Sequence, residues 1–121
     1  LDRAIADVKQ GRFDQAEDRL RRFMNDYPGS PLTGTAWYWL GESQAVRGIQ
    51  AEAARSYLNG YNADRVGFYA PHNLFKLGMV LGRLGQINEA CLTLREVRTQ
   101  FPNAPDGIPA KADAEADNLT C

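Results

Sequence analysis

Apolar and polar residues alternate along the chain with the spacing of amphipathic helices. Leu74, Leu77 and Leu81 fall on one stripe at steps of three and four residues, which places them on a single face of a helix. Stretches that begin shortly after a glycine carry a similar spacing and are predicted to form the second helix of a pair, at residues 13–26, 51–62 and 87–100. Proline-containing stretches at 27–31 and 101–105 break the pattern and separate successive pairs.

The pattern is an internal repeat with a period of 37 residues. A glycine recurs at this period, an alanine follows it five residues later, and a large residue follows the alanine after four more. Glycine suits a helix end with positive φ, and small residues in the helices allow the two helices of a pair to approach closely. Because glycine, alanine and a large residue all recur with the same period, the sequence predicts a stack of three helix pairs. The alternative is a non-repeat helical bundle with similar turns. The series are Gly11, Gly48 and Gly85; Ala16, Ala53 and Ala90; and Leu20, Tyr57 and Leu94.

Helix pairs with small residues at these places resemble tetratricopeptide repeats. The second unit supplies the family pattern most completely, with Trp37-x2-Leu40-Gly41 followed by Ala53 and Tyr57. The resemblance implies an all-α, right-handed α-solenoid of three helix pairs plus a C-terminal capping helix. The first unit departs from the family pattern, and its opening helix is expected to be short.

A single domain is expected, because 121 residues fit one domain. We expect its units at about 1–30, 31–66 and 67–104, followed by a capping helix at about 106–120. The chain begins without a signal-like apolar stretch, so we expect a mature form or an excised domain.

Charge and chemistry favour a binding module over an enzyme. Lys and Arg number 14 against 15 Asp and Glu, for a net charge of −1, which removes the electrostatic basis for strong nucleic-acid binding. No apolar run is long enough to cross a membrane. His72 is the single histidine and has no evident nucleophile or carboxylate partner in the sequence. The chain lacks recognisable catalytic and cofactor motifs, and acidic residues near its end do not have calcium-loop spacing. We therefore predict no enzyme activity, cofactor or metal.

Cys91 and Cys121 are the only cysteines. The last paired helix and the capping helix should run antiparallel, which brings the start of one beside the end of the other. A disulfide between them is therefore favoured and would indicate an oxidising compartment. The alternative is that both cysteines remain unpaired as small apolar residues.

The first helices of the pairs should line the concave surface of the stack. Their faces opposite the core stripe are unusually rich in aromatic and apolar side chains, which suits a groove for a peptide or helix. The alternative is that the aromatic residues pack against neighbouring helices as ordinary core. The predicted groove residues are Ile5, Lys9, Thr35, Tyr38, Trp39, Glu42, His72, Phe75, Met79 and Arg83.

A narrower resemblance is carried by Tyr38-Trp39-Leu40-Gly41-Glu42, by Ala70-Pro71-x2-Leu74-x-Lys76-Leu77-Gly78 and by the 37-residue period. These features are similar to the C-terminal repeat domain of the YbgF/CpoB family, periplasmic accessory proteins of the Tol-Pal system. The cysteine pair resembles that of the alphaproteobacterial branch of this family.

The narrower resemblance implies a non-enzymatic periplasmic adaptor that binds TolA and coordinates outer-membrane constriction with septal peptidoglycan synthesis during cell division. The septal synthesis machinery is a second implied partner. Family members trimerise through an N-terminal coiled coil, so this domain alone is expected to be monomeric or weakly associated. The alternative is another repeat adaptor, such as an outer-membrane assembly lipoprotein or a chaperone co-factor.

Overall fold

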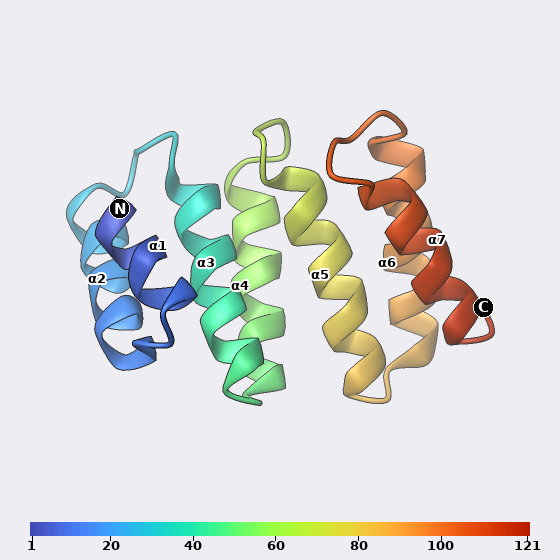
Figure 1. The fold of residues 1–121 in the computed structure, drawn as a ribbon. Helices are drawn as coiled ribbons and strands as arrows, with labels where there is room; N and C mark the ends of the chain where they lie inside the picture. Colours follow the sequence, from blue (N-terminus) through green and yellow to red (C-terminus); the bar gives the residue numbers. More distant parts are fainter.

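The protein is an α-solenoid of seven helices arranged in two rows (Figure 1). The computed structural model describes every residue from 1 to 121. One row consists of α1, α3, α5 and α7, and the other consists of α2, α4 and α6. The helices are α1 (Asp2–Lys9), α2 (Phe13–Asp26), α3 (Thr33–Val46), α4 (Gln50–Ala63), α5 (Ala70–Arg83), α6 (Ile87–Gln100) and α7 (Ile108–Asn118).

The two rows differ in how closely their members approach one another. Contacts join α1 with α3, α3 with α5 and α5 with α7, whereas none joins α2 with α4 or α4 with α6. Helices of the first row are therefore closer together, which places that row on the inner, concave side of the stack. The connections within pairs lie along one edge of the stack, and the longer connections between pairs lie along the other (Figure 1).

The turn within each pair has the glycine conformation that the repeat predicts. Gly11, Gly48 and Gly85 have φ of 78°, 79° and 81°, in the left-handed region that favours glycine. The amide after each glycine donates to the carbonyl oxygen five residues earlier, as in the Arg12-to-Asp7 bond of 2.8 Å. This pair of features is the Schellman arrangement, which satisfies the last carbonyl groups of the first helix.

The core repeats with the same period as the sequence. Ala16, Ala53 and Ala90 are completely buried, and the large residues four positions later are at most 1% exposed. Gly41 and Gly78 lie opposite two of these large residues, because a Cβ at Gly41 would stand 2.6 Å from the Tyr57 ring and one at Gly78 would stand 2.6 Å from Leu94. Small residues on both helices therefore set the close approach within a pair.

The capping helix is shorter than the sequence predicts. We expected it at about 106–120, and α7 runs from Ile108 to Asn118. Asp106 and Gly107 have φ of 62° and 67°, and these left-handed conformations prevent the helix from beginning before Ile108. The short opening helix predicted for the first unit is confirmed, since α1 has 8 residues.

Candidate protein-binding surface

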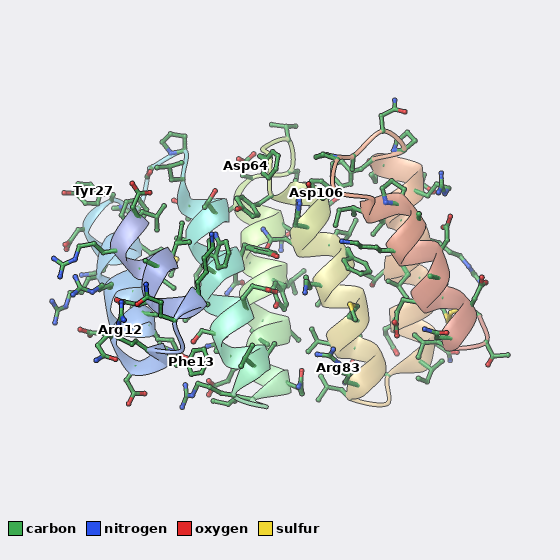
Figure 2. The ribbon with its side chains drawn as sticks, in the orientation of Figure 1. Arg12, Phe13, Tyr27, Asp64, Arg83 and Asp106 are labelled. Carbon is green, nitrogen blue, oxygen red and sulfur yellow. A yellow bond between two sulfur atoms is a disulfide. The ribbon has the colours of Figure 1, made fainter.

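A hollow lies between α3 and α5 on the inner side of the solenoid. Its volume is about 300 Å³, and residues of α3, α4 and α5 line it. Glu42, Met79 and Arg83 belong to the groove predicted from the sequence, and the structure brings these three together here. Figure 2 shows Arg83 at the end of α5 that is nearest the turn within the third pair. The lining residues are Glu42, Ala45, Val46, Tyr57, Lys76, Met79, Val80 and Arg83.

Glu42 is the central charged group of the hollow. The hydroxyl of Tyr57 donates to its Oε1 at 2.5 Å, and Lys76 Nζ lies 3.4 Å from the same oxygen. Burial first, and then the Glu42 carboxylate, raises the pKa of Tyr57 above its ordinary value. The same two causes raise the pKa of Tyr38. Both phenols therefore stay protonated at neutral pH, and Tyr57 is a fixed donor that orients the carboxylate.

Arg83 supplies a positive charge to the lining of the hollow. It is exposed, and none of the ion pairs within the chain involves it. The lining also includes the apolar residues Ala45, Val46, Met79 and Val80, and Val46 is 69% exposed. The hollow thus combines an oriented carboxylate, an apolar wall and an unpaired guanidinium, which suits a polypeptide segment with an apolar side and flanking charges.

An aromatic cluster continues the inner surface towards the loop edge. The rings of Tyr38 and Tyr69 lie 4.6 Å apart, and those of Phe68 and His72 are stacked at 5.0 Å. The Trp39 ring lies 6.3 Å from Tyr69. On its other side, Lys9 Nζ stands 5.4 Å from the centre of the Trp39 ring, within the range of a cation–π contact. Sequence reasoning missed Phe68 and Tyr69, because both precede the helical stripe of α5.

Three of the predicted groove residues are buried. Tyr38, His72 and Phe75 are 8%, 7% and 6% exposed, so they present little area to a partner. Tyr38 packs with residues of α3, α4 and α5, whereas Phe75 packs with residues of α6 and α7. The structure therefore favours the alternative that Tyr38 and Phe75 pack as ordinary core. His72 is buried in the same way.

The remaining predicted residues keep some exposure. Lys9 and Arg83 are exposed, and the others are half-buried on α1, α3 and α5; these are Ile5, Thr35, Trp39, Glu42 and Met79. Experiments on binding should therefore use this exposed set, because truncating a buried aromatic residue would disturb packing as well.

Both ring nitrogens of His72 have hydrogen-bond partners within the chain, and one of these partners is a carboxylate. Its Nε2 lies 2.8 Å from Asp106 Oδ2, and its Nδ1 lies 3.2 Å from the Phe68 carbonyl oxygen. Figure 2 shows Asp106 on the loop before α7, beside the start of α5. The histidine therefore joins this loop to α5. No group of three or more His, Cys, Asp or Glu side chains is arranged to hold a metal ion.

Buried carboxylates in the first repeat were missed by sequence reasoning. Asp7 and Glu17 are 6% and 4% exposed. Asp7 accepts a hydrogen bond from Arg12 at 2.8 Å and lies 3.0 Å from Arg19 Nε. Arg19 therefore pairs with a buried carboxylate and is not simply a surface charge. The signal was present, since Asp7 lies three residues after Ala4 on the buried face of α1.

Glu17 connects α2 to α3. It accepts hydrogen bonds from the Ser43 hydroxyl at 2.6 Å and from Arg47 at 2.8 Å. The bond to Glu17 raises the pKa of Arg47, so this guanidinium is charged at every pH at which the protein is studied. These bonds give the first repeat a polar contact with the second.

The two cysteines form a disulfide. Cys91 on α6 is bonded to Cys121 beyond the end of α7, with the two Cα atoms 5.7 Å apart. The antiparallel arrangement expected for these helices brings the two residues together. No helix of the protein has the length and apolar character that crossing a membrane requires.

Comparison with known proteins identifies the class. Models of the tetratricopeptide repeat match residues 1–65 and residues 72–104. The first match alone spans more than half of the chain, so the chain belongs to the tetratricopeptide repeat family. The fold and the repeats define a protein-interaction module, and they point away from an enzyme.

A narrower similarity supports the resemblance seen in the sequence. The chain is 40% identical over 47 residues to the cell division coordinator CpoB of Pseudomonas putida KT2440, and a second CpoB from Pseudomonas putida matches equally. The matched stretch is 39% of this chain and 18% of each relative. The chain thus spans less than a fifth of the length of these relatives.

Proposed function

We propose that this chain is a periplasmic interaction module that binds a segment of a TolA-like protein and acts in cell division with the Tol-Pal system. The hollow between α3 and α5 carries the proposal, because it presents apolar side chains together with an oriented carboxylate and a free guanidinium. The similarity to proteins named cell division coordinator supports the cellular role. The septal peptidoglycan synthesis machinery is a further proposed partner.

The chemistry of the hollow indicates how a partner segment would lie. Its apolar side chains would enter between Val46 and Met79, while an acidic side chain would face Arg83 at the rim. A basic side chain of the partner would face Glu42, in place of or beside Lys76. Such contacts at a rim set orientation and association rate more than affinity, so the apolar contacts supply most of the binding free energy.

The disulfide supports the proposed compartment. Disulfides persist in oxidising environments such as the periplasm and are rare in reducing cytosol. The bond between Cys91 and Cys121 therefore agrees with a periplasmic protein. The alternative function of a chaperone co-factor is less well supported, because gripping a terminal carboxylate needs several free cations. Lys76 is paired with Glu42, and Lys9 lies over Trp39.

The proposal is tested by calorimetric titration of this chain with the purified periplasmic part of TolA from the same bacterium. We expect Val46→Lys and Arg83→Glu each to weaken binding at least tenfold, since both residues are exposed in the hollow. Leu92→Lys is the matched control, because Leu92 is 63% exposed but lies on α6 in the other row. Circular dichroism should show the same helical content in all variants.

Two results would contradict the proposal in different ways. If the unsubstituted chain does not bind TolA, TolA is not the partner. If all variants bind equally, the hollow is not the site. An outer-membrane assembly adaptor, the remaining alternative, predicts the first of these results.

A further inference from the structure

The capping helix α7 covers the part of α5 that would otherwise continue the binding surface. Leu74 and Phe75 pack in one cluster with Ile108 and Ala112 of α7, and Met79 lies against the same cluster. Nearer the end of α5, Leu119 lies so close to Gly82 that a Cβ there would stand 3.1 Å from its side chain. A helix of the chain itself therefore occupies the place that a partner helix would take on the third repeat.

Met79 links the covered surface to the open hollow. It lines the hollow between α3 and α5 and also packs at the edge of the cluster under α7. Removing α7 would therefore extend the hollow along α5 to Phe75, without any movement of α3 or α4.

Few bonds hold the C-terminal end of α7 in place. The disulfide joins Cys121 to Cys91, and Arg95 donates to the Cys121 carbonyl oxygen at 3.3 Å. The one ion pair along the helix, between Arg98 and Asp113, is half exposed on both sides. Such a surface pair is weak, so the covalent bond and the packing of Leu119 are the main restraints at this end.

The helix is also weak in its own right. It has 11 residues, and isolated helices of that length are marginal in water. Glu115 and Asp117 lie close to its C-terminal end, where negative charge opposes the helix dipole, and its last turn has no basic residue. Ile108 anchors its first turn, but the middle of its packing face consists of Ala112 and Ala116, which bury little apolar area.

We propose that α7 is a redox-controlled cover, held closed by the Cys91–Cys121 disulfide and released from its C-terminal end when a dithiol reduces that bond. One thiolate of the dithiol attacks the sulfur of Cys121, a residue that is exposed, and the Cys91 thiolate leaves. The second thiol of the reductant then attacks the mixed disulfide. The products are two cysteine thiols in the chain and a disulfide in the reductant. Release of Leu119 from Gly82 uncovers Met79 and Phe75 beside the hollow.

The cover is tested by hydrogen exchange of the full chain, followed by mass spectrometry. Three samples are compared: the oxidised chain, the chain reduced with dithiothreitol, and the C91A/C121A variant. We expect the amides of α7 to exchange at least tenfold faster in the last two samples than in the first. The amides of α3 and α4 should exchange at the same rate in all three.

The two methionines provide a second measurement, made on the oxidised chain and on the thiol-free C91A/C121A variant. Hydrogen peroxide converts exposed methionine to the sulfoxide, and Met79 should react at least threefold faster in the variant. Met24 lies on α2, far from α7 in the stack, and is the internal control with an unchanged rate.

Unchanged exchange of α7, or an unchanged rate at Met79, would refute the proposed cover. Equal loss of protection in α3 and α4 would also refute it, because the disulfide would then stabilise the whole fold and not a local cover. None of these measurements uses a partner, so their failure leaves the proposed TolA site untouched.

Discussion

Gly41 is the position at which the close packing of a repeat is most directly testable. An ideal Cβ at Gly41 would stand 2.6, 2.8 and 2.9 Å from three atoms of the Tyr57 ring. Distances below 3 Å require the ring to move. Tyr57 is 1% exposed and its hydroxyl is bonded to Glu42, so the ring is confined at both ends. Gly41→Ala therefore forces the two helices of the second pair apart.

The expected magnitude follows from two opposing effects. Overpacking of a tight core costs about 1–3 kcal/mol, and the rigid ring places this site near the upper end of that range. Alanine gains about 1 kcal/mol over glycine in a helix interior. The free energy of unfolding of Gly41→Ala should therefore be about 1–2 kcal/mol below that of the unsubstituted chain.

Urea denaturation followed by circular dichroism measures the change. Gly82→Ala is the matched control, because Gly82 is also helical but would meet only the flexible end of Leu119, at 3.1 Å. Its free energy of unfolding should be unchanged or slightly higher. In addition, Tyr57→Ala should abolish the cost of Gly41→Ala in a double-mutant cycle. A Gly41→Ala chain as stable as the parent would refute the reasoning, because the glycine would then have no role in helix approach.

Two further predictions concern buried polar groups. Because burial raises the pKa of Tyr57, the folded chain keeps a proton that the unfolded chain loses above pH 10. The free energy of unfolding of the chain should therefore fall in alkali, and Tyr57 should contribute up to about 1.4 kcal/mol per pH unit to this fall. Urea titrations between pH 9 and 11 should show a shallower fall in Tyr57→Phe than in Tyr27→Phe, whose side chain is exposed, and equal slopes would contradict this. Glu17→Ala should lower stability by about 1–3 kcal/mol, because it leaves the buried Ser43 hydroxyl without its acceptor, whereas the exposed control Glu89→Ala should change little. A loss in thermal unfolding temperature that is no greater for Glu17→Ala than for Glu89→Ala would show that this bond is dispensable.

Much of the fold could be predicted because each unit of a repeat can be compared with the other units of the same chain. A single glycine in a helical pattern is weak evidence, but Gly11, Gly48 and Gly85 share one period, and all three have the positive φ that their position requires. The second helix of each pair began within one residue of its predicted start for the same reason. The beginning of α7 was predicted less well, because the helical pattern does not show the left-handed conformation of Asp106, a residue that also contacts His72 across the fold.

The binding surface was harder to predict, because helical register gives the direction of a side chain and not what covers it. Phe75 lies on the predicted inner face of α5, yet the next element, α7, packs over it. Tyr38 packs with residues of α4 and α5 and also against Tyr69, a residue before α5 that no periodic pattern includes. Register therefore places these residues in the inner row of helices, whereas exposure within that row depends on which elements pack over them.

Tyr57 shows why packing and binding are connected in this protein. Its ring fills the space that Gly41 leaves, and its hydroxyl holds Glu42 in the wall of the hollow. One side chain therefore sets the distance between α3 and α4 and also the position of the carboxylate in the hollow. The equivalent residues of the other repeats, Leu20 and Leu94, pack equally well but have no hydroxyl to donate. A stack of similar repeats can thus place a carboxylate held by a tyrosine hydroxyl at one repeat alone, and in this chain that repeat is the second.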